Sequence, residues 1–147
     1  MICDRENQFS DAQVVTTGSE NGILSTDKMD LGVARNIGAG EEMWIVVIVD
    51  TTFTSSGSDD TLAVDLVTDD NPGLNSPTVI QRLGTFPAVS AAGTAIKARV
   101  PFSNSYERYI GLLYTAATGP LTAGAVTAVM TKNIDAFRAY ADAITIS

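Results

Sequence analysis

The chain has no histidine and only one cysteine among its 147 residues. Histidine is the commonest general base and a common metal ligand, so its absence excludes the usual Ser–His and Cys–His nucleophile arrangements. A single cysteine, Cys3, excludes an internal disulfide and is typical of a protein from a reducing compartment. We interpret Cys3 itself as a small apolar residue near a terminus.

Charge is also scarce, at 18% of the residues, and positive charge is the rarer sign, with 9 lysines and arginines against 17 acids. The net charge of −8 and the scatter of the cations argue against a nucleic-acid partner, because phosphate binding needs clustered Lys and Arg. The same charge argues against an anionic membrane surface. Sparse charge leaves uncharged surface that often contacts a partner, and an acidic protein can attach to basic patches on that partner.

Long hydrophobic runs are missing as well. The longest, Met43–Val49, is far shorter than the ~20 residues that cross a bilayer. The first residues, MICDRENQ, are charged and lack the apolar core of a secretion signal. We therefore expect a soluble protein that is in the cytosol when it is made.

Paired carboxylates are the remaining route to acid–base catalysis. The candidates are Asp59-Asp60 and Asp69-Asp70, and both pairs lie among glycine, serine, proline or asparagine in predicted turns. Adjacent side chains on an extended chain point apart, so we interpret these residues as turn caps. The segment DDNPG at 69–73 also lacks the ligand spacing of a calcium loop. The glycines of 32–40 have neither the order of a dinucleotide fingerprint nor a following helix. We expect no catalytic residue, no metal, no cofactor and no enzymatic activity.

Short β-prone runs separated by turn formers cover almost the whole chain. MWIVVIVD at 43–50 is apolar on both faces of an extended chain, which predicts a central strand covered on both sides. TLAVDLVT at 61–68 and TAIKARV at 94–100 alternate, which predicts strands with one buried face. The pattern predicts a one-domain β-sandwich or barrel. The other expected strands are 12–17, two short pieces within 23–31, 78–83, 107–115 and 125–131.

The segment TAATGPLTAGAVTAVM at 115–130 is free of charge. Gly119-Pro120 is predicted to turn the chain, and Gly124 to let it re-enter the sheet without a side-chain clash. Leu121, the one large apolar residue between them, either fills the end of the sandwich or contacts a neighbouring protein.

Two surface features have alternative readings. Trp44 and the tyrosines could form a sugar-binding platform, but Trp44 lies within an apolar strand, so we expect it to pack in the core. Lys97 and Arg99 share the polar face of one strand. These two residues either face solvent or bind an acidic patch on a partner.

Six stretches in a fixed order resemble the capsid cement, or decoration, proteins of tailed bacteriophages. They are FSDAQVVT (9–16), MDLGVARNIGAGEEMWIVV (29–47), FTSSGSDDTLAVDLVTDD (53–70), NSPTVI (75–80), ERYIGLLY (107–114) and TGPLTAGAVTAVMTK (118–132). The resemblance runs from about Phe9 to Lys132, nearly the whole chain.

The resemblance implies an all-β protein with an antiparallel two-sheet jelly-roll sandwich over 11–132, an N-terminal arm at 1–10 and a C-terminal arm at 133–147. It implies a virion protein on the outer surface of an icosahedral shell, present in the host cytoplasm before assembly. Such a protein bridges neighbouring major capsid protein subunits and stabilises the shell. It also implies a small symmetric oligomer, with a homodimer as first choice and a trimer as second. The family has no catalytic residues to transfer.

The two arms are the expected sites of shell contact, because apolar residues on terminal arms are often docked on another surface. The alternative is that both arms fold back over their own sandwich, and 133–147 forms either one or two helical turns or an extended arm. The expected partner-binding residues are Ile2, Arg5, Phe9, Lys97, Arg99, Leu121, Phe137 and Tyr140.

Two other functions remain as alternatives. A carbohydrate-binding β-sandwich module of a phage tail or surface structure would need exposed coplanar aromatic rings. A carboxylate-dependent hydrolase would need a pair of carboxylates on one strand face.

Overall fold

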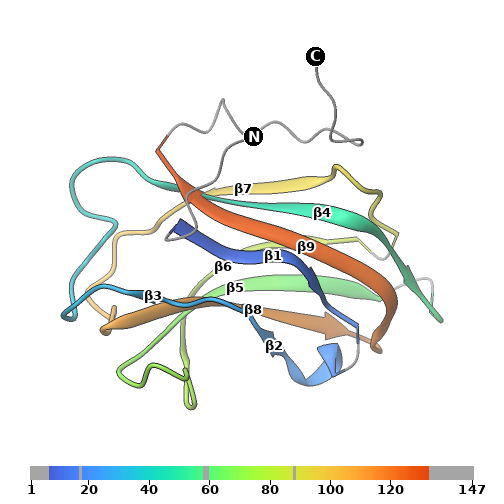
Figure 1. Cartoon of the computed structure of the whole chain (residues 1–147), viewed down its shortest axis with the longest axis horizontal. Coiled ribbons are helices and arrows are strands. Elements are labelled where there is room, and N and C mark those ends of the chain that lie inside the picture. The colour runs from blue at the N-terminus through green and yellow to red at the C-terminus, as the bar shows by residue number, and fades with distance from the viewer. Residues whose placement is uncertain (1–6, 17, 58–59, 88, 133–147) are drawn as a thin grey trace.

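The computed structural model describes residues 7–16, 18–57, 60–87 and 89–132, which form two antiparallel β-sheets packed face to face (Figure 1). One sheet has the strand order β1-β9-β4-β7 and is called sheet A; the other, sheet B, has the order β2-β8-β5-β6, with β3 also paired to β8. The elements are β1 (Gln8–Val14), the 3₁₀ helix η2 (Ser19–Asn21), β2 (Ile23–Leu24), β3 (Met29–Asp30), β4 (Trp44–Ser55), β5 (Thr61–Asp69), β6 (Thr78–Phe86), β7 (Ala95–Arg99), β8 (Tyr109–Ala117) and β9 (Leu121–Thr131).

The strands β2 and β3 are two pieces of one interrupted strand. Leu24 pairs with Leu113, Met29 pairs with Ile110 further along β8, and between them the Ser25 amide donates to the Leu112 carbonyl at 2.8 Å. Counted as one strand, they complete two four-stranded sheets. The chain then passes from one sheet to the other at every connection except the one from β5 to β6. This arrangement is the double-sheet jelly roll, so the predicted all-β sandwich is confirmed.

The strand β4 lies inside sheet A, between β9 and β7, and is buried on both faces as its sequence predicts. Ile45, Val47 and Val49 point into the space between the sheets and belong to the main core. Val46 and Ile48 point to the opposite face, where they form a second small cluster that includes Val129 and Ala95. A central strand with apolar residues on both faces gains from burial on each of them.

Alternation places the inner face of sheet B correctly, but the expectation of one buried face is wrong for β5, which is buried on both faces. Leu62, Val64 and Leu66 of β5 are fully buried in the core. Phe53 of β4 and Phe86 of β6 meet edge to face between the sheets, with ring centroids 5.5 Å apart and an interplanar angle of 86°. Edge-to-face contact suits the charge distribution of aromatic rings. The core therefore ties the two sheets together near the end of β4.

The strand β9 begins at Leu121, four residues before the expected start at 125, because the whole segment after the Gly119-Pro120 turn enters the sheet. A Cβ on Gly124 would lie 2.6 Å from the Phe53 ring, so the predicted need for a residue without a side chain is confirmed. Leu121 is 3% exposed and packs in the main core. It fills the end of the sandwich.

The boundary of the N-terminal arm needs a correction. The strand β1 begins at Gln8 and pairs with β9, so residues 8–10 of the predicted arm belong to sheet A. Phe9 points inward and is only 1% exposed, because an apolar residue next to the sheet gains more from the core than from solvent. Asn7, directly before β1, is exposed, and the rest of the predicted arms, residues 1–6 and 133–147, lies outside the described residues.

Candidate functional site

Two of the carboxylates singled out in the sequence, Asp60 and Asp69, act as turn caps. The Asp69 carboxylate accepts hydrogen bonds from the amides of Asn71 at 3.1 Å and Ser76 at 2.8 Å. The Asp60 carboxylate accepts one from the Gly57 amide at 3.2 Å. Asp59 lies outside the described residues, and Asp70 is exposed. The carboxylates of Asp60 and Asp69 therefore bind backbone amides within turns.

The loop that Asp69 caps is more than a solvent-facing turn. Leu74 in this loop is 1% exposed and lies against the outer face of sheet B. A Cβ on Gly111 of β8 would come within 2.6 Å of the Leu74 side chain. The loop therefore closes over one end of sheet B and removes apolar surface from solvent.

Within 7–16, 18–57, 60–87 and 89–132, no group of three or more His, Cys, Asp or Glu side chains is placed to hold a metal ion. No helix in the same ranges is long and apolar enough to span a bilayer.

Four of the eight expected partner-binding residues can be placed. Phe9 and Leu121 are core residues, so their side chains are not available to a partner, and their expected role is corrected to packing. Lys97 and Arg99 are exposed on the outer face of sheet A, and Arg99 lies 3.5 Å from the Glu42 carboxylate. The remaining four lie outside the described residues: Ile2, Arg5, Phe137 and Tyr140.

The aromatic residues give no sugar-binding platform in the described part of the chain. Trp44 is half-buried, and Tyr106 and Tyr114 are 4% and 0% exposed. The Tyr114 hydroxyl lies 2.8 Å from the Ser10 hydroxyl inside the sandwich, and burial raises the pKa of Tyr114 far above its usual range. Tyr109 is half-buried, and the Cζ atom of the Arg108 guanidinium lies over its ring, 5.1 Å from the ring centroid. The three tyrosines pack or stack within the protein, whereas Trp44 lies on the face of β4 that Val46 occupies, outside the main core, so its expected core position is wrong.

Two loops at one end of the sandwich are locked together, and we call residues 31–43 and 100–108 the paired loops. The Asn36 side-chain oxygen accepts hydrogen bonds from the amides of Gly38 at 3.1 Å and Ser103 at 3.2 Å. The backbones touch directly, since a Cβ on Gly38 would lie 2.0 Å from the Pro101 carbonyl oxygen. Such contacts hold both loops in one conformation.

A buried tyrosine holds the second of the paired loops, residues 100–108, through a hydrogen bond to its backbone. The Tyr106 hydroxyl donates to the Pro101 carbonyl at 2.7 Å, and the side chain is 4% exposed. Burial raises the pKa of Tyr106 to about 12, so the hydroxyl keeps its proton and remains a donor across the physiological range. The main-chain carbonyl of Pro101 therefore has a permanent hydrogen-bond donor in Tyr106, and the same carbonyl is in close contact with Gly38.

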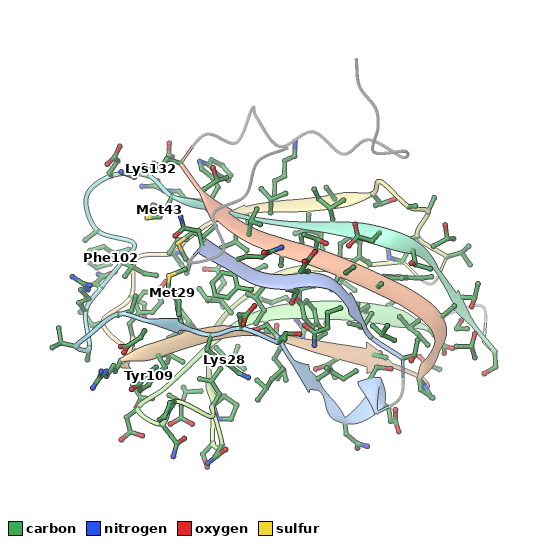
Figure 2. All side chains as sticks on the ribbon, in the orientation of Figure 1. Lys28, Met29, Met43, Phe102, Tyr109 and Lys132 are labelled. Atoms are coloured by element: carbon green, nitrogen blue, oxygen red, sulfur yellow. The ribbon has the colours of Figure 1, made fainter. Side chains whose placement is uncertain are left out.

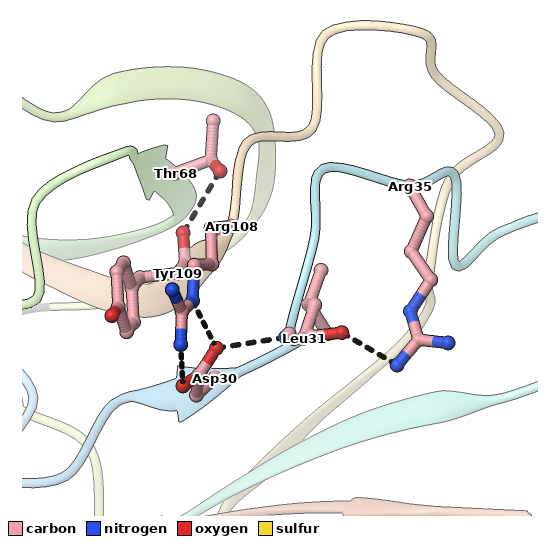
Figure 3. Close-up of polar contacts among 7 residues, drawn as sticks. Asp30, Leu31, Arg35, Thr68, Arg108 and Tyr109 are labelled. Carbon is pink, nitrogen blue, oxygen red and sulfur yellow. Dashed lines mark hydrogen bonds and ion pairs between the residues drawn. The ribbon is translucent and has the colours of Figure 1, made fainter.

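The start of the first loop is fixed by an ion pair, shown in Figure 3. The Arg108 guanidinium donates two hydrogen bonds to the Asp30 carboxylate, at 2.8 and 2.9 Å, and the Gly32 amide donates a third at 2.7 Å. The Arg35 guanidinium turns back to the Leu31 carbonyl at 2.6 Å. The bidentate pair joins β3 to the residue before β8, and Arg35 stabilises the turn that follows.

A neighbouring hydroxyl ties the second loop to β5. The Thr68 hydroxyl donates to the Tyr109 carbonyl at 2.9 Å and accepts from the Glu107 amide at 2.8 Å. Thr68 is fully buried, so both of its hydrogen bonds replace lost contacts with water. The paired loops are therefore anchored at their ends as well as to each other.

The Asp30 ion pair predicts a pH effect on stability. The Arg108 hydrogen bonds lower the pKa of Asp30 from 3.8 to about 2, with help from the Gly32 amide. A carboxyl group with a lowered folded-state pKa adds stability above its unfolded pKa, and that stability is lost as the pH falls through the folded value. We expect the urea midpoint to fall between about pH 4 and pH 2, and to fall less steeply in Asp30→Asn.

Asp50 supplies a control with the opposite sign. Burial raises the pKa of Asp50, so its contribution to stability decreases as the pH rises above the unfolded value of 3.8. Asp50→Asn should leave the decline below pH 4 in place. Equal slopes for the wild type and Asp30→Asn would contradict the assigned ion pair.

The paired loops display apolar side chains to solvent. Phe102 is 70% exposed and Val33 is 64% exposed, and Figure 2 shows Phe102 at the end of the sandwich, away from the core. Beside Phe102 lies an open hollow of about 520 Å³, and the residues that line it include Arg99, Gln81, Gly38 and Gly40. Sequence reasoning missed Phe102 and Val33. The available signal was a large apolar residue within a segment of turn formers, PFSNS at 101–105.

A protein-family model called Bbp16 matches residues 9–130. The matched range runs from β1 almost to the end of β9 and includes both sheets and the paired loops. No match was found among the curated proteins.

Proposed function

The chain belongs to the Bbp16 family, which is associated with phages, and we propose that it is a structural protein of the virion, a capsid cement or decoration protein. In this role it binds the outer surface of an icosahedral phage shell, bridges neighbouring major capsid protein subunits and stabilises the capsid. The observation that carries the phage association is the family match, which covers residues 9–130, almost the whole sandwich. The cement role is proposed from the ordered sequence resemblance. The ordered resemblance to cement proteins covers the same residues.

The physical character of the described residues supports a binding role. The paired loops are held by backbone and side-chain contacts and display exposed apolar side chains. A preformed surface loses little conformational entropy when a partner binds. The conspicuous carboxylates Asp60 and Asp69 are used in turns. We propose that the protein is not an enzyme, has no cofactor, and binds neither nucleic acid nor membrane.

The proposed partners are the major capsid protein and further copies of this chain. A homodimer is the first choice and a trimer the second, since a symmetric oligomer can contact two shell subunits at once. Stable interfaces bury on the order of 1,600 Å² in total, which a sandwich of this size can provide. The protein would be in the host cytoplasm before assembly and on the outside of the capsid afterwards.

The test uses shells assembled without the protein. Purified chain is added in increasing amounts, and the shells are sedimented and analysed for bound protein. We expect saturation at a fixed ratio to the major capsid protein and a higher shell-disruption temperature, because a ligand that binds only the assembled state stabilises it by RT ln(1 + [L]/Kd) per site. Failure to sediment with the shells, or binding without saturation, would contradict the proposal.

A further inference from the structure

Few large apolar side chains are exposed on the surface of the described residues. The exposed large apolar residues are Val14, Val33, Val79, Val89 and Phe102. Phe102 is the one aromatic residue in this group, and Val33 belongs to the loop locked against it. Aromatic residues are frequent energetic anchors of interfaces because they bury a large area and have few rotatable bonds. The paired loops are thus the described surface best suited to anchor a partner.

The contacts within the paired loops favour binding by a fixed shape. Ser103, directly after Phe102, donates its amide to Asn36, and Pro101, directly before it, is held by Tyr106 and by contact with Gly38. Val33 lies three positions before Asn36, at most about 11 Å along the chain. Phe102 and Val33 therefore project from one rigid unit, and only their side chains remain to be ordered on binding.

Charge distinguishes this end from the opposite one. Around the paired loops, Arg99, Arg108 and Lys132 lie against Glu42, Asp30 and Glu41, and Arg35 adds a guanidinium bonded to a backbone carbonyl. The described residues of the opposite end, within 15–23, 52–61, 87–94 and 117–121, include Glu20 and Asp60 and no lysine or arginine. Glu107, Asp69 and the exposed Asp70 also lie at the end of the paired loops, so it is not positive overall. It nevertheless holds four cations, whereas the described residues of the opposite end hold none, so of the two ends only the one with the paired loops offers favourable groups to a carboxylate of a partner.

The residues that line the hollow beside Phe102 indicate which chemical group of a partner could enter it. Arg99 and Gln81 line the hollow and offer hydrogen-bond donors, and its volume of about 520 Å³ leaves room for a side chain to enter. Arg99 is 3.5 Å from Glu42, and both side chains are more than half exposed, so this ion pair is weak and can be exchanged. A guanidinium favours a carboxylate in a bidentate geometry. The matching group on a partner is an aspartate or glutamate next to an apolar pocket.

From these features we propose that the paired loops dock directly on the capsid shell, with Phe102 entering an apolar pocket of a shell protein and a shell carboxylate entering the hollow to meet Arg99. This inference rests on the proposed cement function. It assigns the contact to the loop end of the sandwich, in addition to any contact by the terminal arms. A contact between two copies of this chain is the competing use of the same surface.

The experiment titrates undecorated shells with wild-type protein and three variants, and measures the dissociation constant by co-sedimentation. Phe102→Ala should bind roughly 30-fold more weakly, the loss typical of a central aromatic anchor. Arg99→Gln should bind roughly tenfold more weakly and show a smaller decrease of affinity with added salt. Val89→Ala, at a 71% exposed position on the opposite end, is the matched control and should bind as the wild type does.

The outcomes separate the two proposals. If the wild type does not bind shells at all, the cement function itself fails. If the wild type binds and Phe102→Ala binds equally well, the cement function stands and the docking surface is wrong. Sedimentation velocity of the free wild type and variants measures self-association. If Phe102→Ala abolishes self-association but leaves the dissociation constant for shells unchanged, the paired loops join copies of this chain. That result would overturn the docking proposal.

Discussion

Replacing Phe53 with alanine is expected to lower the free energy of unfolding by about 3–5 kcal/mol, the range for removal of a buried aromatic ring. Phe53 is fully buried, and its ring meets Phe86 from the opposite sheet. It also fills the space left open by Gly124. The loss combines the transfer of the ring to water with a cavity that the flanking strands close only in part. Urea denaturation followed by fluorescence or circular dichroism measures the change.

The exposed Phe102 provides a control with the same chemical substitution. Phe102→Ala should change the free energy of unfolding by less than about 0.5 kcal/mol, since its side chain is 70% exposed. The same measurement shows that this variant is folded when it is tested for shell binding. If both variants lost equal stability, or if Phe53→Ala lost none, the placement of the core between the two sheets would be wrong.

Replacing Gly38 with alanine is expected to destabilise the fold by about 3 kcal/mol, at the upper end of the range for overpacking. The added Cβ would lie 2.0 Å from the Pro101 oxygen and 2.6 Å from the Phe102 nitrogen. Both atoms belong to the backbone, so no side-chain rotation can relieve the clash. The loops must separate, which breaks the hydrogen bonds of Asn36 and displaces Phe102. We expect a lower urea midpoint together with weaker shell binding.

Gly119→Ala is the matched control for Gly38→Ala. The nearest atom to a Cβ at Gly119 belongs to the Asp60 side chain at 3.7 Å, an ordinary van der Waals distance. The variant should unfold within about 0.5 kcal/mol of the wild type. Wild-type stability in Gly38→Ala would mean that the paired loops are not in contact through their backbones.

The parts of the fold that sequence could predict are those that depend on local patterns. Alternation along β5 identified Leu62, Val64 and Leu66 as inward residues, and the two-faced apolar run of β4 identified an internal strand. Turn capping by Asp60 and Asp69 was also predictable, because a carboxylate cap involves amides only a few residues away. Each of these features depends on residues that lie within about ten positions of one another in the sequence.

Long-range contacts account for the features that the residue pattern missed. Phe9 was assigned to an arm because a short segment near a terminus gives too few residues to establish a period, yet β1 pairs with β9 more than a hundred residues away. The start of β9 was placed too late because Ala123 and Gly124 are of residue types depleted in strands, so they obscure the strand that begins at Leu121. The order of the strands in the jelly roll was implied by the family resemblance. Periodicity alone left sandwich and barrel open.

The candidate site shows the same division. Lys97 and Arg99 were correctly placed on the polar face of one strand, because alternation settles which way they point. The paired loops depend on Asn36 bonding to Ser103, 67 residues away, and on the contact between Gly38 and Pro101. Neither contact leaves a local signal, so the locking of the two loops could not be anticipated from the sequence, whereas the turn formers around Phe102 at 101–105 were a local signal for its exposure.

The central claim, that the protein fastens subunits of a phage shell from outside, is tested most directly by electron cryomicroscopy of shells with and without the chain. The account predicts added density on the outer surface, shaped as a two-sheet sandwich and touching at least two neighbouring subunits of the major capsid protein. A map in which decorated and undecorated shells are identical would contradict the account, and so would density confined to the inside of the shell.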